Sequence, residues 1–254
     1  MMLEGKKIVV AGAAGLLGAQ LVLKLIQQGA EVIAIDRDLI SLNDKLSKSG
    51  VDINSPALQK FILDLSEECA VIKFFDSAEG ITGAVNCSYP RNKNYGKHFF
   101  EVAQADFNEN ISLNLGSSFL FMQQCAAYFK RVQSDFSLVN ISSIYGIVAP
   151  KFDVYENTKM TMPVEYAAIK SALLHLSKYV VAYVADSRFR VNSVSPGGIF
   201  DHQPSDFLEA YKCQTLGKGM LDVDDVIGSI VYLLSDYARY VNGQNIVVDD
   251  GFIL

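Results

Sequence analysis

Short apolar segments alternate with longer amphipathic ones along the whole chain, and this alternation restricts the fold more than any other feature. We expect strands at residues 8–11, 32–36, 61–64, 81–86, 137–142, 190–195 and 245–248. We expect helices at 16–28, 66–75, 111–129, 166–184 and 223–234, with Ser66 and Asp222 as N-caps. Near-continuous hydrophobicity is typical of parallel strands buried on both faces. The pattern therefore predicts an α/β fold with a doubly wound, mostly parallel seven-stranded sheet and helices on both faces.

The composition is that of a folded protein with a sizeable core. Half of the 254 residues are hydrophobic and 20% are charged. No repeat, linker or low-complexity tract divides the chain, and we expect one domain over residues 1–254. The net charge of −6 argues against nucleic acid or an anionic membrane as a partner. No apolar run reaches the roughly 18 residues of a membrane span, so we expect a cytoplasmic protein.

Cysteine and histidine are too scattered along the chain to predict a metal site. The cysteines show no C-x-x-C spacing, and the three histidines show no ligand spacing. We expect no bound metal. We interpret all four cysteines as buried thiols in a reducing compartment: Cys69, Cys87, Cys125 and Cys213.

A glycine-rich turn, Gly12-Ala-Ala-Gly15-Leu-Leu17-Gly18, closes the first expected strand and opens the first expected helix. Glycine permits the tight turn and lets backbone N–H groups approach a pyrophosphate at the helix N-terminus. Asp36 ends the second expected strand, where a carboxylate can accept hydrogen bonds from ribose hydroxyls and repel a 2′-phosphate. These residues predict a Rossmann dinucleotide site that favours NAD, while the adjacent Arg37 leaves NADP open.

The pattern Tyr-x-x-x-Lys occurs twice, at Tyr155/Lys159 and at Tyr166/Lys170. On a helix this spacing puts both side chains on one face. An ammonium beside a cationic cofactor would favour the phenolate and lower the tyrosine pKa, giving a proton donor and acceptor for carbonyl–alcohol interconversion. Each copy alone is weak evidence, because two common residues often share this spacing by chance.

The chain resembles the short-chain dehydrogenase/reductase family from Gly12 to Gly251. The resemblance is carried by an ordered set of motifs: the glycine turn, Asp64-Leu65, Asn86, Asn114-Leu-Gly-Ser, Asn140-Ile-Ser-Ser143, Tyr166-Ala-Ala-Ile-Lys170, Arg190-Val-Asn-Ser-Val-Ser-Pro196-Gly197, Asp224-Asp-Val226 and Asn242-Gly-Gln-Asn-Ile-Val-Val-Asp249. As an ordered set these motifs are far more specific than any one of them. The resemblance implies a single-domain NAD(P)-dependent dehydrogenase or reductase.

Context separates the two tyrosine–lysine pairs. Tyr155 lies 12 residues beyond Ser143, near the separation usual in the family, whereas Tyr166 lies 23 beyond it. The downstream sequence favours Tyr166, because a long helical pattern follows Lys170 and Pro196 comes 26 residues after it. Pro163 also disfavours a helix that continues past Lys159. We therefore expect Tyr166/Lys170 to be the reactive pair, and Tyr155 to be a loop aromatic or a substrate contact in an inserted segment.

The resemblance implies a role for each matching residue. Tyr166 would be the general acid/base, Lys170 would lower its pKa and hold the nicotinamide ribose, Ser143 would bind the substrate oxygen, and Asn114 would anchor a water in the proton relay. Ser142 is expected to be structural, since successive strand side chains diverge. The cofactor would contact Gly12, Gly15, Leu17, Gly18, Asp36, Arg37, Asp64, Leu65, Asn86, Tyr166, Lys170, Pro196, Gly197 and Ile199.

The chain departs from the family pattern near the cofactor. Ala11 replaces a threonine, and Asn86-Cys-Ser-Tyr89 replaces Asn-Asn-Ala-Gly after the fourth expected strand. We expect Tyr89 to narrow the cofactor cleft. Irregular stretches at 89–100, 144–164 and 198–219 all follow expected strands, so they should overhang the carboxyl edge of the sheet, where ligands bind in such folds.

The substrate is predicted less sharply than the chemistry. Four basic residues, Arg91, Lys93, Lys97 and His98, cluster in one irregular stretch and suggest a small-molecule substrate such as a phosphorylated or nucleotide-linked sugar, although a solvated loop would look the same. The pattern is similar to members of bacterial surface-sugar or flagellin-glycan pathways. Alternatives are an NAD-dependent sugar epimerase or dehydratase, and a non-catalytic dinucleotide-binding protein. The resemblance also implies a homotetramer or homodimer.

Overall fold

Seven strands form one sheet in the order β3-β2-β1-β4-β5-β6-β7, and every neighbouring pair is parallel. The computed structural model describes residues 1–254. The strands are β1 (Lys7–Ala11), β2 (Glu31–Asp36), β3 (Leu58–Ile62), β4 (Gly83–Asn86), β5 (Phe136–Ile141), β6 (Phe189–Pro196) and β7 (Asn245–Val248). The predicted doubly wound fold is confirmed. Because the strand order reverses between β1 and β4, the crevice for a ligand is expected beyond their carboxyl ends.

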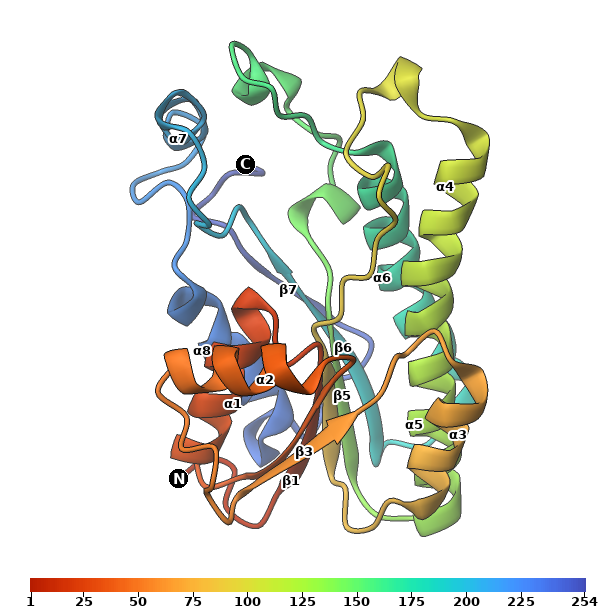
Figure 1. The fold of residues 1–254 in the computed structure, drawn as a ribbon. Helices are drawn as coiled ribbons and strands as arrows, with labels where there is room; N and C mark the ends of the chain where they lie inside the picture. Colours follow the sequence, from red (N-terminus) through yellow and green to blue (C-terminus); the bar gives the residue numbers. More distant parts are fainter.

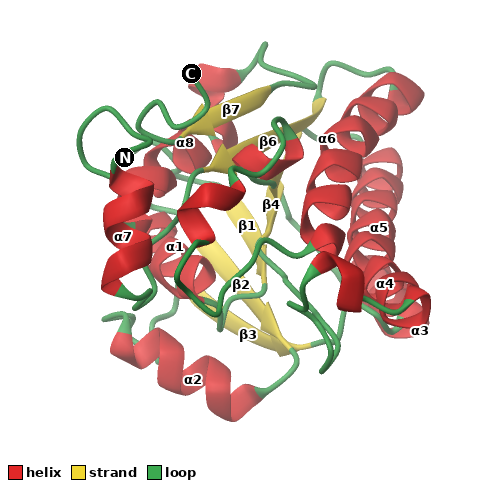
Figure 2. Ribbon diagram, turned by 90° about the horizontal axis from the view of Figure 1, so that it is seen from above, coloured by secondary structure: helices red, strands yellow, loops and turns green.

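Helices cover both faces of the sheet (Figures 1 and 2). One layer holds α1 (Leu16–Gln27), α2 (Leu39–Lys48) and α8 (Val223–Leu234), and the other holds α3 (Glu68–Ser77), α4 (Gln104–Asn110), α5 (Ser117–Val132) and α6 (Val164–Val184). Each layer buries its own apolar cluster against the sheet. The remaining helix, α7 (Ser205–Lys212), lies beyond the carboxyl edge, at the top of Figure 1. None of the helices combines the length and the apolar character that a membrane crossing requires.

Three helices were not expected, and their sequences explain why. α4 buries only Asn110, so it has no apolar period. α2 and α7 are short, and each buries one pair of residues four apart, Leu42/Leu46 and Phe207/Tyr211. In α2 the Asp38 carboxylate also accepts a hydrogen bond from the Ser41 N–H at 2.6 Å, a capping signal that the sequence contained.

Several expected boundaries were wrong. β3 starts at Leu58 and ends at Ile62, three and two residues before the bounds expected at 61 and 64, and its apolar residues Phe61 and Ile62 are exposed at the edge of the sheet. The apolar run instead continues past the strand to Leu63, which turns into the core. Ser66 is not the N-cap of α3, because its N–H and hydroxyl both donate to Asp64 and Glu67 holds the cap position.

Other expectations agree with the structure or need correction. Asp222 caps α8 as predicted, in a capping box with Asp225. The cysteines are all free thiols, but only Cys125 is buried. Cys69 and Cys213 are exposed, because each lies on the solvent side of its segment.

Candidate active site

The three irregular stretches lie together at the carboxyl edge of the sheet, toward the top of Figure 1. The 89–98 loop follows β4, the 144–163 segment follows β5, and the stretch that contains α7 follows β6. The 144–163 segment contains two short 3-10 turns, Ile144–Gly146 and Phe152–Tyr155. Side chains from these stretches surround the start of α6, which carries Tyr166.

Tyr166 and Lys170 share one face of α6. The helix begins at Val164, directly after Pro163, whose fixed backbone suits the position before a helix. The Lys170 Nζ lies 5.5 Å from the centre of the Tyr166 ring and donates a hydrogen bond to the Ile141 carbonyl at 2.8 Å. Lys170 is 6% exposed, and burial lowers its pKa to about 8. The ammonium is thus fixed beside the tyrosine by the end of β5.

Ser142 and Ser143 point in different directions, as expected for neighbours at a strand end. The Ser142 hydroxyl donates to the Lys170 carbonyl at 2.9 Å, which ties β5 to α6. The Ser143 hydroxyl accepts a hydrogen bond from the Tyr145 N–H at 3.2 Å. It also lies near enough to Tyr166 to act against the rise in the pKa of that residue. Ser143 and Tyr166 therefore meet despite the 23 residues between them.

The pKa of Tyr166 is raised in the chain itself. Burial raises it, and the hydrogen bond with Ser143 opposes that rise without cancelling it. Burial thus dominates the pKa of Tyr166, because the residue is deeply enclosed and desolvation disfavours the phenolate. The lowering of this pKa by Lys170 together with a cationic cofactor stays a prediction. Tyr166 is protonated near neutral pH in this state.

Asn114 lies in a π-helical segment, Ile111–Gly116, that joins α4 to α5. Its side chain is 3% exposed, and its Nδ2 lies 3.5 Å from the Pro90 carbonyl. Such bulges are frequent at functional sites, because they break the regular pattern of backbone bonds. A continuous helix was expected here, so the π segment is a correction to the prediction. Asn114 thus lies where the helix passes the start of the 89–98 loop.

The glycine turn fits a pyrophosphate. Gly12 has a positive φ of 77°, and a Cβ there would lie 2.7 Å from the Ser88 backbone. A Cβ at Gly18 would lie 2.2 Å from the Gly12 carbonyl oxygen. No side chain caps α1, since its N-cap is Gly15, and its first N–H groups have no helical partner. Leu17 is buried beneath the turn.

Asp36 holds the glycine turn against β2. Its two carboxylate oxygens accept hydrogen bonds from the N–H groups of Ala14 at 2.9 Å and Arg37 at 2.8 Å. A carboxylate has about four acceptor positions, so capacity for ribose hydroxyls remains. The Arg37 side chain is exposed and lies near enough to Asp64 to lower the pKa of that carboxyl.

Asp64 and Asn86 have structural partners of their own. Burial tends to raise the pKa of Asp64, but hydrogen bonds from the Ser66 N–H and hydroxyl outweigh it and lower the pKa overall. The Asn86 Oδ1 accepts from the Ser88 N–H at 3.1 Å and hydroxyl at 2.7 Å, while its Nδ2 donates to Ser118 at 3.2 Å. Leu65 is buried between them and the core. Asp64 and Asn86 thus shape the crevice indirectly, because their side chains hold the backbone of the loops after β3 and β4.

Pro196 and Gly197 end β6 beside β7 and α7. The Gly197 N–H donates to the Val248 carbonyl at 2.8 Å, and the Gly198 N–H donates to the Tyr211 hydroxyl at 2.6 Å. A Cβ at Gly197 would lie 2.8 Å from that hydroxyl. Ile199 pairs with Leu221 in an isolated bridge. The turn after β6 is thus fixed by β7 and by α7, at the end of the crevice where the nicotinamide is expected.

Tyr89 contacts both Tyr166 and Lys170, a position more specific than the expected narrowing of the cofactor cleft. Its ring meets Tyr166 edge-on, with ring centres 5.6 Å apart and planes at 86°. The Lys170 Nζ lies 5.5 Å from the Tyr89 ring centre. The Tyr89 hydroxyl is hydrogen-bonded to that of Tyr95, and burial raises the pKa of both.

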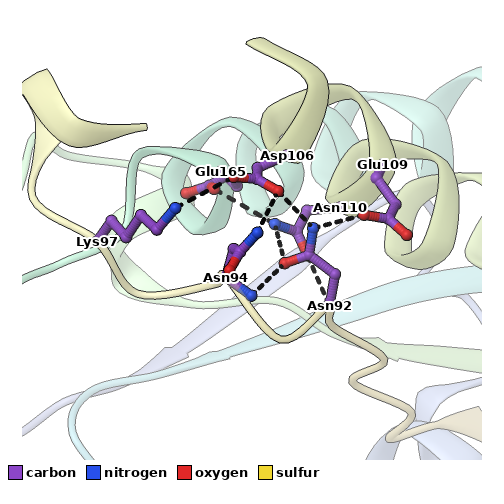
Figure 3. A network of polar contacts seen from close by, with 7 residues as sticks. All are labelled: Asn92, Asn94, Lys97, Asp106, Glu109, Asn110 and Glu165. Atoms are coloured by element: carbon purple, nitrogen blue, oxygen red, sulfur yellow. Dashed lines mark hydrogen bonds and ion pairs between the residues drawn. The ribbon is translucent and has the colours of Figure 1, made fainter. Parts of the chain in front are cut away.

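A polar network attaches the 89–98 loop to α4 and α6 (Figure 3). Asn110 is its centre: its Oδ1 accepts from the Asn92 N–H at 2.9 Å, and its Nδ2 donates to Glu165 at 3.3 Å. Asn94 donates to Asp106 at 2.8 Å. Glu165 is 1% exposed and directly precedes Tyr166. The sequence offered no periodic signal for these residues, because they are polar groups buried by loop packing.

Tyr155 is buried in a third apolar cluster, whereas Lys159 is exposed to solvent. The cluster joins the 144–163 segment to α7 and the C-terminus through Tyr145, Tyr155, Phe207, Tyr211 and Phe252. The Tyr155 and Phe207 ring centres are 5.2 Å apart. Tyr155 is therefore a buried aromatic of the inserted segment, and its contact with a substrate stays a prediction.

Comparison with known proteins gives consistent matches along the chain. A family model described as enoyl-(acyl carrier protein) reductase matches residues 12–253. The chain is 38% identical over 257 residues to post-translational flagellin modification protein A of Campylobacter coli, with 99% of each covered. It is 26% identical over 262 residues to 7alpha-hydroxysteroid dehydrogenase of Bacteroides fragilis, covering 99% of this chain and 95% of that protein.

A solved structure shares the fold at full length. The crystal structure of a short chain dehydrogenase from Leptospira borgpetersenii with bound NAD+ superposes with a TM-score of 0.87 and 28% identity. The match covers 100% of this chain and 94% of that one. The similarity thus includes the glycine turn, the end of β5 and the start of α6.

Proposed function

This chain belongs to the short-chain dehydrogenase/reductase family, and we propose that it transfers a hydride between NAD(H) and a secondary alcohol or carbonyl substrate. The observation that carries the proposal is the meeting of Ser143, Tyr166 and Lys170 at the carboxyl edge of the sheet. Ser143 lies just after β5, whereas Tyr166 and Lys170 lie on α6. Two bonds tie these segments together, from the Lys170 Nζ to the Ile141 carbonyl and from the Ser142 hydroxyl to the Lys170 carbonyl. Such convergence of an acid/base, a cation and a hydroxyl fits proton transfer coupled to hydride transfer.

The proton steps follow from these positions. In reduction, the Tyr166 hydroxyl donates its proton to the substrate oxygen, while the Ser143 hydroxyl donates a hydrogen bond that holds this oxygen in place. In oxidation, Tyr166 takes the proton back. Because the pKa of Tyr166 is raised in the protein alone, the residue begins as the acid. NAD(H) would supply or accept the hydride, and the positive charge of its oxidised nicotinamide ring would favour the Tyr166 phenolate.

NAD fits the residues that would hold the cofactor. The open N-terminus of α1 would bind the pyrophosphate, and Asp36 would bind the adenosine ribose and repel a 2′-phosphate. Arg37 faces the Asp64 carboxylate, which would also repel a 2′-phosphate. The Leptospira relative was solved with NAD+. We expect the Kd for NADH to be at least tenfold lower than that for NADPH, and the reverse order would contradict this assignment.

We infer a sugar-like substrate, phosphorylated or nucleotide-linked, and a role in carbohydrate metabolism in the cytoplasm. Support comes from the flagellin modification protein of Campylobacter coli and from basic side chains in the 89–98 loop. The 38% identity to the flagellin modification protein is a guide to the class of pathway. Ser143 and Lys170, the polar side chains near Tyr166, suit a hydroxylated molecule.

Oligomerisation is a further part of the proposal. Aromatic side chains remain exposed on α5 and α6: Phe119 is 47% exposed, Tyr179 61% and Tyr183 73%. A homotetramer or homodimer formed through these helices would cover them. Light scattering of the purified protein tests this, and a monomer at micromolar concentration would contradict it.

The direct test of the function is NADH turnover with a panel of sugar phosphates and nucleotide sugars. Substrate-dependent loss or gain of NADH absorbance is expected for at least one member. Cofactor that copurifies while products form without net NADH change would instead indicate an epimerase or dehydratase. Tight NADH binding with no chemical change in any substrate would indicate a non-catalytic dinucleotide-binding protein.

A further inference from the structure

Tyr89 and Tyr95 form an aromatic shelf beside the proposed acid/base. Their ring centres are 5.8 Å apart, their planes are perpendicular, and their hydroxyls are hydrogen-bonded. Tyr89 also meets the Tyr166 ring at 5.6 Å. The shelf therefore borders the place where the reacting carbon of a substrate would lie.

The shelf is rigidly attached to the scaffold. Asn92 and Asn94 follow Tyr89 in the loop and bond to α4, through Asn110 at 2.9 Å and Asp106 at 2.8 Å (Figure 3). Asn92 also donates to Glu109 at 2.7 Å. A loop fixed in this way needs little further ordering when a ligand binds, and this preorganisation improves affinity.

Arg91 lies on the shelf and has no carboxylate partner. Its guanidinium carbon is 5.5 Å from the Tyr89 ring centre and 5.9 Å from that of Tyr95. No ion pair or hydrogen bond engages its N–H groups. Stacking on aromatic rings uses the face of a guanidinium and leaves the N–H donors at its edge free. Arg91 is exposed to solvent and thus presents unpaired N–H donors beside the two rings.

Neighbouring basic residues differ from Arg91 in this respect. Lys97 pairs with Asp106 at 3.3 Å, and the Lys151 Nζ donates to the Phe252 carbonyl at 2.7 Å. Lys93 and His98 are exposed and contact no ring of the shelf. Of the cations on the 89–98 loop, Arg91 alone is both unpaired and in contact with the rings of the shelf.

We propose that Arg91 binds an oxyanion of the substrate, a phosphate or a carboxylate, at the end remote from the reacting carbon. Tyr89 contacts both residues: its ring centre lies 5.5 Å from the Arg91 guanidinium carbon and 5.6 Å from the Tyr166 ring centre. One small polyhydroxylated molecule can therefore reach both. Arginine suits this role because its planar fork binds carboxylate and phosphate through two hydrogen bonds. The proposal rests on the proposed function, since it assigns the substrate of that same site.

The test compares anionic and neutral sugars on protein saturated with NAD, so that phosphate cannot bind at the cofactor site. Calorimetry measures the Kd for glucose 6-phosphate, glucuronate and glucose. The wild-type protein is expected to bind one of the two anions ~10–100-fold more tightly than glucose, the range for hydrogen bonds to a charged group. The preferred anion identifies phosphate or carboxylate as the recognised group.

Substitutions complete the test. Arg91→Ala is expected to abolish the preference, and Arg91→Lys to retain part of it. The control is Arg239→Ala, because Arg239 is also stacked on a tyrosine, Tyr240 at 6.0 Å, but far from the site. It should keep the full preference. Wild-type protein that binds neither anion better than glucose overturns the proposal, as does Arg91→Ala with an unchanged preference.

The same assay separates this proposal from the proposed function. Tyr166→Phe removes the acid/base hydroxyl but leaves Arg91 and its shelf in place. If the anion preference persists in that variant, recognition by Arg91 stands whatever the turnover measurements show. If turnover depends on Tyr166 while the preference never appears, hydride transfer stands and the role of Arg91 is wrong.

Discussion

Tyr155/Lys159 and Tyr166/Lys170 have the same spacing in the sequence and opposite surroundings in the structure. Tyr166 and Lys170 lie on consecutive turns of α6, and Lys170 is buried against the end of β5. Tyr155 ends a 3-10 turn, and Lys159 lies four residues later in a loop, exposed to solvent. The shared spacing places side chains together only where a helix continues through both residues.

The second pair nevertheless has a definite place. Tyr155 packs against Phe207 of α7, so the 144–163 segment is joined to the stretch after β6. Tyr145 connects the two regions, because its N–H donates to Ser143 while its ring belongs to the Tyr155 cluster. We therefore propose the reactive groups in one copy, while the tyrosine of the other packs the neighbouring 144–163 segment against α7.

The largest expected difference between the pairs comes from removing each lysine. Lys170→Met should lower kcat/KM by ~10²-fold or more, because it removes the cation beside Tyr166. Lys159→Met should change kcat/KM by less than twofold, since Lys159 is exposed and has no contact with the site. Steady-state kinetics of both variants measure this. Equal losses in the two variants would show that the comparison is wrong.

The next effect concerns the contact between the two regions. A Cβ at Gly146 would lie 2.7 Å from the Lys170 backbone carbonyl, so Gly146→Ala must displace the 3-10 turn or α6. We expect a loss of about 1–3 kcal/mol in the free energy of unfolding and a fall in kcat. Urea unfolding and kinetics measure the two quantities.

Gly228→Ala in α8 is the matched control. No atom lies within 4 Å of a Cβ at Gly228, so the substitution should stabilise the protein by about 0.4–1 kcal/mol and leave kcat unchanged. A Gly146→Ala variant as stable and active as Gly228→Ala would contradict the close packing of the 144–163 segment on α6.

A further effect is a pH dependence of stability. The pKa of Lys170 is lowered from 10.5 to about 8 by burial. Between these values the unfolded chain binds more protons at this residue, so its contribution to stability rises with pH. Below pH 8 the contribution is constant. Unfolding free energies measured across this window should rise more in wild type than in Lys170→Met, whereas Lys159→Met should follow wild type. Parallel curves for wild type and Lys170→Met would contradict the burial of this ammonium.

Much of the fold could be predicted from the sequence, because buried parallel strands and amphipathic helices leave clear patterns. β7 and α8 match their expected bounds. The edge strand β3 was misplaced, since its apolar run continues past the strand into the core at Leu63. Helix α4 was missed because polar contacts around Asn110, and not an apolar face, hold it in place.

The candidate site was predictable only in part. The family resemblance and the helix after Pro163 selected Tyr166 and Lys170, which the structure places together. The raised pKa of Tyr166 was not predictable, because it depends on enclosure by segments distant in sequence. The position of Tyr89 and Arg91 depends on a network across three elements, for which a single sequence carries no periodic signal.

The central claim is that Tyr166, and not Tyr155, is the acid/base, and matched Tyr→Phe substitutions test it most directly. Each substitution removes one hydroxyl and keeps the ring. Single-turnover hydride transfer at saturating NADH should slow by ~10²–10⁴-fold in Tyr166→Phe with the Kd for NADH unchanged. In Tyr155→Phe the rate should stay within a few-fold of wild type, with any change confined to substrate affinity. A wild-type rate in Tyr166→Phe, or the larger loss in Tyr155→Phe, would contradict the account.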